Sequence, residues 1–344
     1  MPKPEWTLLI HGGAGVMRRD EMTAEMDAAY RAGLNDALEA GSKVLAGGGQ
    51  ALDAVEAAVR VLEDNPNFNA GKGAVLTREG VAELDASIMD GRDRRAGAVA
   101  QVRTVKNPIR AARHVMEHSG RVMFAGPDVD DMAAKAGLEI VPPEYFITPR
   151  RLDALKRAMA GNLVPMDRHG TVGAVAMDRQ GNLAAATSTG GMNAKPPGRV
   201  GDSPVIGAGT YAENTSCAVS ATGDGEFFIR ASVARMICAR VEMQKLSAEQ
   251  AAQVTLDEVK ALGGTGGVIV LSHDGSVALA MNTEGMFRGR ADASGVRAVG
   301  IYVDEYVVTK SFSGLSRESR FDLRRNSQIV PSISQPRFSG QARE

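Results

Sequence analysis

Strands without a polar face are the feature of this sequence that most restricts its fold. Thr171 to Met177 and Leu183 to Ser188 consist almost entirely of small and apolar residues and are separated by a short turn. A similar pair follows at Gly267 to Leu271 and Val277 to Met281. A strand that is apolar on both sides is buried on both sides, as in a sheet enclosed between layers. We therefore predict two hairpins that lie inside a layered domain.

Segments with helical periodicity flank these strands in both halves of the chain. In Gln50 to Glu63 the apolar residues fall on one face, and Asn107-Pro108 is a typical helix start. The predicted helices are Met22 to Leu45, Gln50 to Glu63, a helix from Pro108, Gly126 to Gly137, Leu152 to Met159 and Arg230 to Gln244, and further strands are predicted at Trp6 to Ile10, Val99 to Val105 and around Ala218 to Ala221. This order favours an α/β fold with four layers, helix–sheet–sheet–helix (αββα).

Composition and charge exclude several classes of protein. The 344 residues carry a net charge of −1, which argues against binding to nucleic acid. No apolar run is long enough for a membrane span, and the N-terminus lacks the apolar core of a signal peptide. The two cysteines, Cys217 and Cys238, are too few for a disulfide framework and fit a reducing compartment as small buried hydrophobes. We therefore expect a cytoplasmic protein.

Two segments lack any regular pattern. Residues 161–170 mix glycine with charged residues and predict an exposed, mobile linker. Residues 311–344 are rich in Ser and Arg and predict a disordered or loosely docked tail.

The usual catalytic motifs are absent, and clusters of hydroxylated residues beside glycines remain. The five histidines show no metal-protease spacing, and His114 and His118 are interpreted as a surface pair. There is no nucleophile elbow with Ser between glycines and no phosphate-binding loop. The clusters are 170–173, 187–191 and 222–225, together with the Lys195, Arg199 and Asp202 loop.

Long motifs in a fixed order carry a clearer signal than any single cluster. They are His11 to Gly15, Asn69 to Gly73, Glu83 to Ala86, Gly170 to Ala176, Gly181 to Met192, Lys195 to Pro204, Thr222 to Arg230 and Asn282 to Met286. Through them the chain resembles the plant-type L-asparaginases, also called isoaspartyl peptidases, from about residue 5 to 305. These are N-terminal-nucleophile hydrolases of the threonine type. One departure is Asn193, which stands where these enzymes commonly have Thr.

The resemblance implies that the chain cuts itself between Gly170 and Thr171. Residues 1–170 would become an α subunit and 171–310 a β subunit of the same domain. Thr171 would then be the nucleophile, with its freed α-amine as the base. Such an amine has an ordinary pKa of about 7.7–8.0 and is substantially neutral near pH 8.

The resemblance also assigns the remaining site residues. It implies that Thr189 hydrogen-bonds the nucleophile and that Thr222 and the Gly223 N–H stabilise the oxyanion. Arg199 and Asp202 would bind the substrate, together with Gly223 and Gly225, and Asn69 would support the nucleophile. No cofactor is expected for the chemistry. A structural sodium ion would be held by the carbonyl oxygens of Leu62, Asn65, Phe68, Ala70 and Lys72.

The expected function is hydrolysis of L-asparagine and of N-terminal isoaspartyl peptides through a threonyl acyl-enzyme. The expected partners are these small molecules and a second copy, in a dimer of cleaved αβ units, without nucleic acid or membrane. A glycosylasparaginase acting on glycosylated asparagine is one alternative. The other is a non-catalytic relative that keeps the fold as a binding protein.

Overall fold

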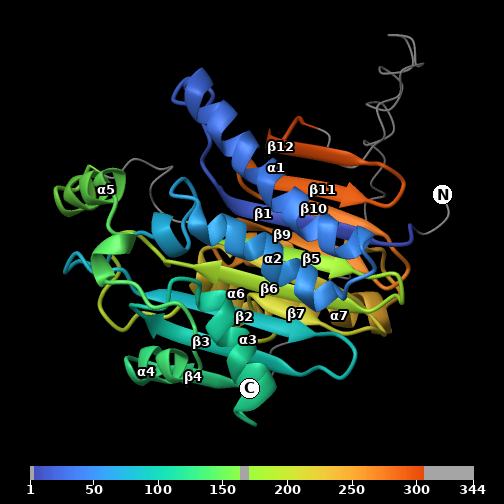
Figure 1. The fold of residues 1–344 in the computed structure, drawn as a ribbon. Helices are drawn as coiled ribbons and strands as arrows, with labels where there is room; N and C mark the ends of the chain where they lie inside the picture. Colours follow the sequence, from blue (N-terminus) through green and yellow to red (C-terminus); the bar gives the residue numbers. More distant parts are fainter. Residues whose placement is uncertain (1–3, 163–169, 306–344) are drawn as a thin grey trace, which may run out of the picture. The chain divides into compact units, whose positions relative to one another are not determined.

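Two β-sheets that face each other form the centre of the computed structural model, which describes residues 4–162 and 170–305 (Figure 1). The larger sheet has the order β12-β11-β1-β5-β6-β2-β3-β4 and the smaller one β10-β9-β8-β7. The strands of the larger sheet are β1 (Thr7–Gly15), β2 (Leu84–Asp90), β3 (Ala96–Val102), β4 (Met123–Ala125), β5 (Val172–Met177), β6 (Leu183–Thr189), β11 (Gly285–Asp292) and β12 (Arg297–Tyr302). Those of the smaller sheet are β7 (Thr210–Ala212), β8 (Cys217–Gly223), β9 (Gly266–Ser272) and β10 (Val277–Met281).

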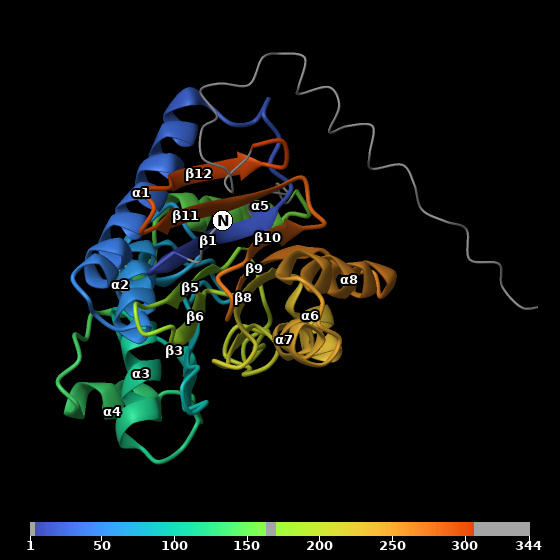
Figure 2. The ribbon, with the colours of Figure 1, turned by 90° about the vertical axis from the view of Figure 1, so that its right-hand side faces the viewer.

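Helices cover the outer faces of both sheets, as the edge-on view in Figure 2 shows. The larger sheet is covered by α1 (Ala24–Ala46), α2 (Ala51–Asp64) and α3 (Pro108–His118), and the smaller one by α6 (Gly225–Ala231), α7 (Val233–Met243) and α8 (Ala248–Ala261). Two short helices, α4 (Asp128–Lys135) and α5 (Pro149–Met159), and two 3₁₀ turns, Gly71–Gly73 and Pro143–Phe146, complete the described elements. The predicted αββα sandwich is confirmed.

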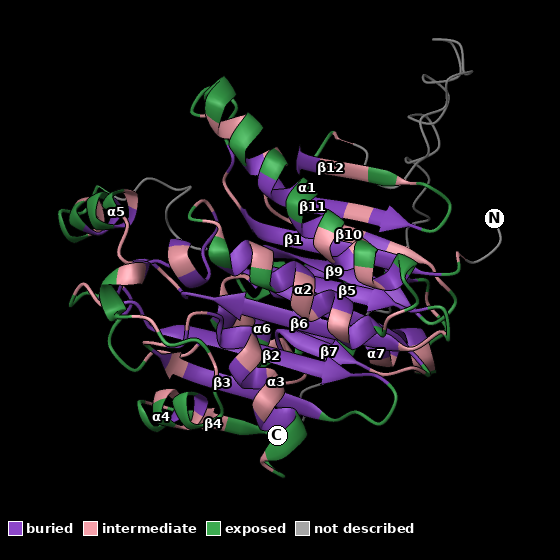
Figure 3. Ribbon diagram, in the orientation of Figure 1, coloured by how far each residue is buried: buried purple, intermediate pink, exposed green. Residues whose placement is uncertain are grey.

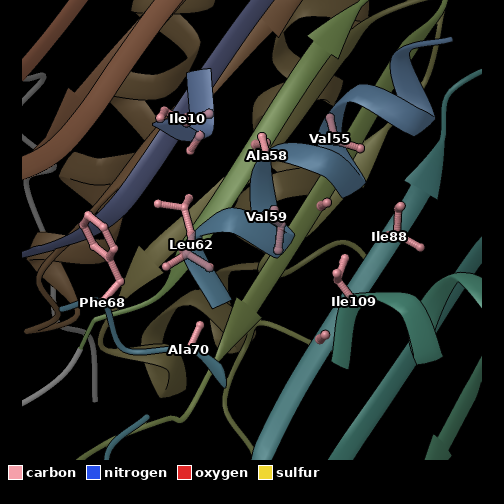
Figure 4. Packing of buried hydrophobic residues seen from close by; sticks show 14 of the residues in the cluster. Ile10, Val55, Ala58, Val59, Leu62, Phe68, Ala70, Ile88 and Ile109 are labelled. Atoms are coloured by element: carbon pink, nitrogen blue, oxygen red, sulfur yellow. The ribbon is translucent and has the colours of Figure 1, made fainter. Parts of the chain in front are cut away.

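Both faces of the central strands are buried because each strand divides its side chains between two cores (Figure 3). Leu8 and Ile10 of β1 pack toward α1 and α2, whereas Leu9 packs between the sheets. Figure 4 shows Ile10 beside the apolar stripe of α2, from Val55 to Leu62. The two predicted hairpins are also confirmed, since β5 pairs with β6 and β9 with β10 in antiparallel register.

The first and second halves of the chain interleave within the larger sheet. β1, from the first half, lies between β11 and β5 of the second half. β2, β3 and β4 extend the sheet beyond β6. Each predicted subunit therefore supplies only part of one continuous sheet.

Two predicted elements differ from the structure. The strand predicted over Trp6 to Ile10 is longer in the structure, because β1 continues through the glycines to Gly15, with a bulge between His11 and Gly13. The single helix predicted over 230–244 is two helices, because Ser232 adopts a left-handed conformation (φ 49°) between α6 and α7.

The prediction of two unbonded cysteines is also wrong. Cys217 and Cys238 are fully buried, as expected, but they form a disulfide that joins β8 to α7. The packing of this helix on the strand brings the two Cα atoms to 5.2 Å, inside the range that a disulfide spans. The cysteines therefore give no argument for a reducing compartment, and the cytoplasmic location stays a prediction.

Residues 163–169 of the predicted linker and all of the predicted tail lie outside the described residues. Among the described helices, none is long and apolar enough to cross a membrane. In the described part of the chain, no group of three or more His, Cys, Asp and Glu side chains is placed to hold a metal ion. The rings of His114 and His118 lie side by side on α3, with centroids 4.8 Å apart and planes tilted by 44°.

Candidate active site

The Gly170–Thr171 peptide bond lies at the start of β5, between β1 and β6. The antiparallel register pairs Val172 with Ser188 and so brings Thr171 beside Thr189. The Thr171 hydroxyl lies 2.7 Å from the Gly170 carbonyl oxygen and 3.1 Å from the Thr189 hydroxyl. Thr171 is 5% exposed. The hydroxyl beside this bond is therefore enclosed among polar groups.

The Gly170 carbonyl oxygen accepts hydrogen bonds from fixed side chains. Asn69 Nδ2 donates to it at 2.9 Å and Thr189 Oγ1 at 3.0 Å. The Asn69 amide is itself held, since its Oδ1 accepts from Val75 N at 2.8 Å and its Nδ2 also donates to Gly191 O at 2.7 Å. Donors that converge on a carbonyl oxygen stabilise the negative charge that develops there during attack on the carbon.

The glycine segment of β1 lies directly against this bond. A Cβ on Gly13 would be 3.1 Å from Gly170 Cα, and the backbone there has φ +115°, so only glycine fits without strain. The next residue, Ala14, donates its N–H to Thr222 Oγ1 at 3.3 Å. The segment therefore connects the end of β8, where Thr222 lies, with the Gly170–Thr171 bond.

His11 of the same segment contacts the backbone of Thr171 and not its hydroxyl. Its Nδ1 lies 3.0 Å from Thr171 O and its Nε2 2.8 Å from Ser220 Oγ. Burial lowers the pKa of His11 to about 3, only partly offset by the hydrogen bond to Thr171. His11 is thus a neutral imidazole, and its geometry does not fit a base for the Thr171 hydroxyl.

Arg199 and Asp202 lie together beside these groups, with glycines between them. A Cβ on Gly191 would be 3.3 Å from Arg199 Nη1, and one on Gly225 would be 2.8 Å from Asp202 Oδ1 and 3.2 Å from Arg199 Nη2. Because Gly191 O also accepts from Asn69, the pair adjoins the Gly170–Thr171 cluster. The guanidinium of Arg199 also forms a two-bond ion pair with Glu226, at 2.9 and 3.0 Å.

Buried charge is concentrated at this loop. Burial raises the pKa of Asp202 to about 7, with Arg199 opposing the shift, and no described residue donates to its Oδ2. Burial raises the pKa of Asp85 and lowers that of Lys195, and each partly offsets the shift of the other. Lys195 Nζ donates to Glu83 O at 2.8 Å. Arg199 and Asp202 therefore offer a cationic and an acidic group for a zwitterionic ligand beside Gly191, whose carbonyl shares the Asn69 amide with Gly170.

The loop predicted to hold sodium, 62–72, is partly buried, with Asp64 and Pro66 exposed. Three of its carbonyl groups lie close to Gly71 and Gly73, and only that of Phe68 is among the predicted ligands. A Cβ on Gly71 would be 2.3 Å from Glu63 O, and one on Gly73 would be 2.1 Å from Phe68 O and 2.7 Å from Pro66 O. The two carboxylates in this stretch are used elsewhere, Glu63 by Ile109 N and Ser188 and Asp64 by Asn107. Carbonyl oxygens in such a cradle are suitable ligands for a hard cation.

Comparisons of the sequence with known proteins identify the family. Residues 4–301 match the family model described as "Asparaginase". The chain belongs to the asparaginase family. It is 48% identical over 306 residues to the isoaspartyl peptidases of Salmonella typhimurium and Escherichia coli, covering 86% of this chain and 98% and 95% of those proteins. It is 45% identical over 273 residues to the isoaspartyl peptidase/L-asparaginase of Mus musculus, covering 78% of this chain and 82% of the mouse protein. As an asparaginase-family protein, this chain is a hydrolase.

Most predicted site residues of this asparaginase-family chain lie in one region. Thr171, Thr189, Gly170 and Asn69 share direct hydrogen bonds, whereas Thr222 reaches them only through Ala14. Gly223, at φ +151°, packs against Thr265 and Gly266. Sequence reasoning missed His11 and Glu226, although both lie in motifs that were singled out.

Proposed function

We propose that this chain is a self-cleaving amidohydrolase that hydrolyses L-asparagine and removes N-terminal isoaspartyl residues from peptides. The observation that carries the proposal is the environment of the Gly170 carbonyl, which accepts from Asn69 and Thr189 beside the Thr171 hydroxyl. The names of the similar proteins support the same substrates.

Cleavage begins with attack of Thr171 Oγ1 on the Gly170 carbonyl carbon. Asn69 and Thr189 donate to the oxygen as it becomes negative. The C–N bond then breaks and the proton of Oγ1 passes to the Thr171 nitrogen, which leaves an ester on Oγ1 and a free α-amine on Thr171. Water then hydrolyses the ester and frees the hydroxyl. Before cleavage the nitrogen is an amide and cannot act as a base, so cleavage creates the catalyst.

Substrate hydrolysis repeats the chemistry on the side-chain amide of the substrate. The α-amine of Thr171 accepts the proton from Oγ1, which attacks the amide carbon, while Thr222 and the Gly223 N–H face the oxyanion. The leaving nitrogen takes the proton and departs as ammonia or as the amine of the released peptide. Water hydrolyses the acyl-enzyme to aspartate. Arg199 and Asp202, with Gly223 and Gly225, bind the α-carboxylate and the α-ammonium of the substrate.

Substitution of the hydroxyl groups around the nucleophile should reduce turnover strongly. Thr222→Ala should lower kcat by about 10²–10³, because loss of one oxyanion donor has this effect in hydrolases. Thr189→Ala should also lower kcat, because Thr189 is hydrogen-bonded to the nucleophile. Thr189→Ala should also slow self-cleavage, since Thr189 donates to the Gly170 carbonyl. Steady-state kinetics on fully cleaved protein measure the first effect and a time course of fragment formation the second. Unchanged turnover in Thr222→Ala would refute its oxyanion role.

The affinity for the zwitterionic product should depend on the ionisation of Asp202. With a pKa raised to about 7, Asp202 is a carboxylate at pH 8 and mostly protonated at pH 6. Only the ionised form attracts an ammonium group, so affinity is present above the pKa and lost below it. The inhibition constant of L-aspartate should rise toward about tenfold per pH unit below 7. An inhibition constant that does not change between pH 8 and 6 would contradict this assignment.

The two fragments should remain together after cleavage. β1 is hydrogen-bonded on one side to β11 and on the other to β5, so separation would leave open sheet edges and apolar faces. We infer a stable αβ unit and a dimer of such units. Sizing chromatography in native buffer should elute both fragments in one peak at the size of two full chains. A second fragment that elutes alone would contradict the inference.

The proposal includes a structural sodium ion in the 62–72 loop. The carbonyl oxygens of Leu62, Asn65, Phe68, Ala70 and Lys72 would hold it, and it would stabilise the loop that presents Asn69.

The proposal also includes a cytoplasmic location.

Three substrates separate this function from its alternatives. Cleaved enzyme is incubated with L-asparagine, with an isoaspartyl dipeptide and with glycosylated asparagine, and released aspartate is measured. We expect the first two to be hydrolysed and the third to be left intact. Hydrolysis of the glycosylated compound alone would identify a glycosylasparaginase, and no hydrolysis at all would identify a binding protein.

A further inference from the structure

A chain of buried side-chain hydrogen bonds runs between the two sheets from Thr171 toward the Arg199–Asp202 loop. It begins where His11 contacts Thr171 O and Ser220, and its next links are Ser220 to Thr187 (2.7 Å), Thr187 to Thr210 (2.5 Å) and Thr210 to Ser87 (2.7 Å). Ser87 ends it at the carbonyl of Ser203, 2.6 Å away, next to Asp202. The five side chains, His11, Ser220, Thr187, Thr210 and Ser87, are 0% exposed.

The protons in this chain can be ordered in only one direction at its His11 end. The Thr171 carbonyl can only accept, so Nδ1 of His11 carries a proton and donates to it. The pKa of about 3 leaves the ring neutral near pH 7, and Nε2 must then accept from Ser220. Since a hydroxyl has one proton, Ser220 in turn accepts from Thr187, and Thr187 from Thr210. These three hydroxyls therefore donate toward Thr171, whereas Ser87, which also has one proton, donates either to Thr210 or to the Ser203 carbonyl.

Gly173 leaves the space that this chain occupies. A Cβ at residue 173 would lie 2.0 Å from Ser220 Oγ and 2.4 Å from His11 Nε2. Any side chain would therefore displace one partner of the His11–Ser220 hydrogen bond. Gly173 lies on β5, two residues after Thr171 and on the same face of the strand. The absence of a side chain at Gly173 therefore leaves room for the His11–Ser220 hydrogen bond.

We propose that His11 is a positioning residue for the nucleophile, held as its Nδ1–H tautomer by the Thr171 carbonyl and by the hydroxyls of Ser220, Thr187 and Thr210. This inference rests on the proposed function and adds a role that the Thr171 chemistry itself does not require. His11 does not touch the reacting hydroxyl. It acts through the carbonyl of the residue that carries both the hydroxyl and the α-amine.

Cleavage makes this contact more important. In the intact chain, Thr171 is held on its N-terminal side by the peptide bond to Gly170, whose carbonyl is bound by Asn69 and Thr189. Cleavage removes that covalent restraint. The new N-terminal residue is then held on its C-terminal side, where its carbonyl accepts a hydrogen bond from His11. Removal of the bond should therefore impair turnover more than self-cleavage.

The tautomer can be measured without any assay of activity. The chain has five histidines, so the ring ¹⁵N–¹H correlation spectrum of histidine-labelled protein is simple, and the His11 signals are those lost in His11→Asn. We expect Nδ1 protonated and Nε2 unprotonated at neutral pH. A spectrum with the proton on Nε2, or on both nitrogens, would overturn the proposal even if the enzyme is active as proposed.

Kinetics of variants test the positioning role itself. His11→Ala should lower kcat by about tenfold or more, as expected for loss of a buried hydrogen bond, with KM changed less than about twofold. His11→Asn should recover most of kcat, because the Asn Nδ2 is bonded to Cγ, like the His Nδ1, and can donate to the Thr171 carbonyl from a similar position. Ser220→Ala should fall between them. Ser272→Ala, a buried hydroxyl on β9 outside the chain, is the matched control and should behave as wild type.

Three results would overturn the proposal: wild-type kcat in His11→Ala, no recovery in His11→Asn, or loss of self-cleavage in a folded His11→Ala protein that exceeds its loss of turnover. If His11→Ala does not fold, the tautomer spectrum and the Ser220→Ala kinetics decide. Failure of the wild-type protein to cleave or to hydrolyse L-asparagine would instead refute the proposed function. The wild-type control in each assay distinguishes this failure from failure of the His11 proposal.

Discussion

Thr171→Ala should remain a single chain of 344 residues under conditions in which the wild-type protein separates into two fragments on a denaturing gel. The substitution removes the only proposed attacking atom, Oγ1, and leaves the Gly170 carbonyl with its donors from Asn69 and Thr189. Asparagine hydrolysis should fall to background, because neither the hydroxyl nor the free α-amine exists. Gel densitometry over time and an ammonia-release assay measure the two losses.

Thr171→Ser is the matched control for this variant. It keeps the hydroxyl and removes only a methyl group, so it should still yield both fragments. Cleavage of Thr171→Ala at the same bond would mean that another residue attacks, and the mechanism given above would be wrong.

Arg199→Ala and Asp202→Ala should each reduce kcat/KM for L-asparagine by about 10²–10³ while leaving self-cleavage largely intact. Removal of one partner of a buried charged hydrogen bond has an effect of this size. The two reactions should respond differently because their substrates differ. L-Asparagine presents a free α-carboxylate and α-ammonium, whereas the chain around Gly170 presents neither. An ordinary α-linked aspartyl dipeptide should be a poor substrate even for wild type, because its α-carboxylate is used in the peptide bond.

An exposed ion pair supplies the control for Arg199 and Asp202. Arg297 pairs with Glu39 on the surface, and Arg297→Ala should leave turnover unchanged. Glu226→Ala tests Arg199 in a different way, because it frees the two Arg199 donors that Glu226 occupies in the structure. Normal turnover of L-asparagine in both Arg199→Ala and Asp202→Ala would show that the pair is only structural.

Local patterns in the sequence predicted the layers well, because burial on both faces leaves a strong signal. The stripe of α2 is buried as its spacing requires, with Leu52 4% exposed and Val55, Val59 and Leu62 fully buried. The strands β2, β11 and β12 carry polar residues such as Asp85, Arg288 and Arg297 and were missed, since their pairing is decided by distant strands. The helix α8 is absent from the predictions although Ser247 and Gln250 form a capping box that the sequence displays.

The site was predictable to the extent that its residues lie in motifs. Resemblance pointed to Thr171, Thr189 and Asn69, and the structure places them within hydrogen-bond distance of one another or of Gly170 O. The buried chain from His11 to Ser87 could not be predicted, because its members come from five strands that are brought together only by the tertiary fold. The disulfide was missed for a related reason: the packing of α7 on β8 is a tertiary contact.

N-terminal sequencing of the second fragment of purified wild-type protein tests the central claim most directly. The account predicts fragments of 170 and 174 residues, since 344 − 170 = 174, with the second beginning Thr-Val-Gly-Ala from Thr171. A protein that hydrolyses L-asparagine while its chain remains intact, or whose second fragment begins at any residue other than Thr171, would contradict it.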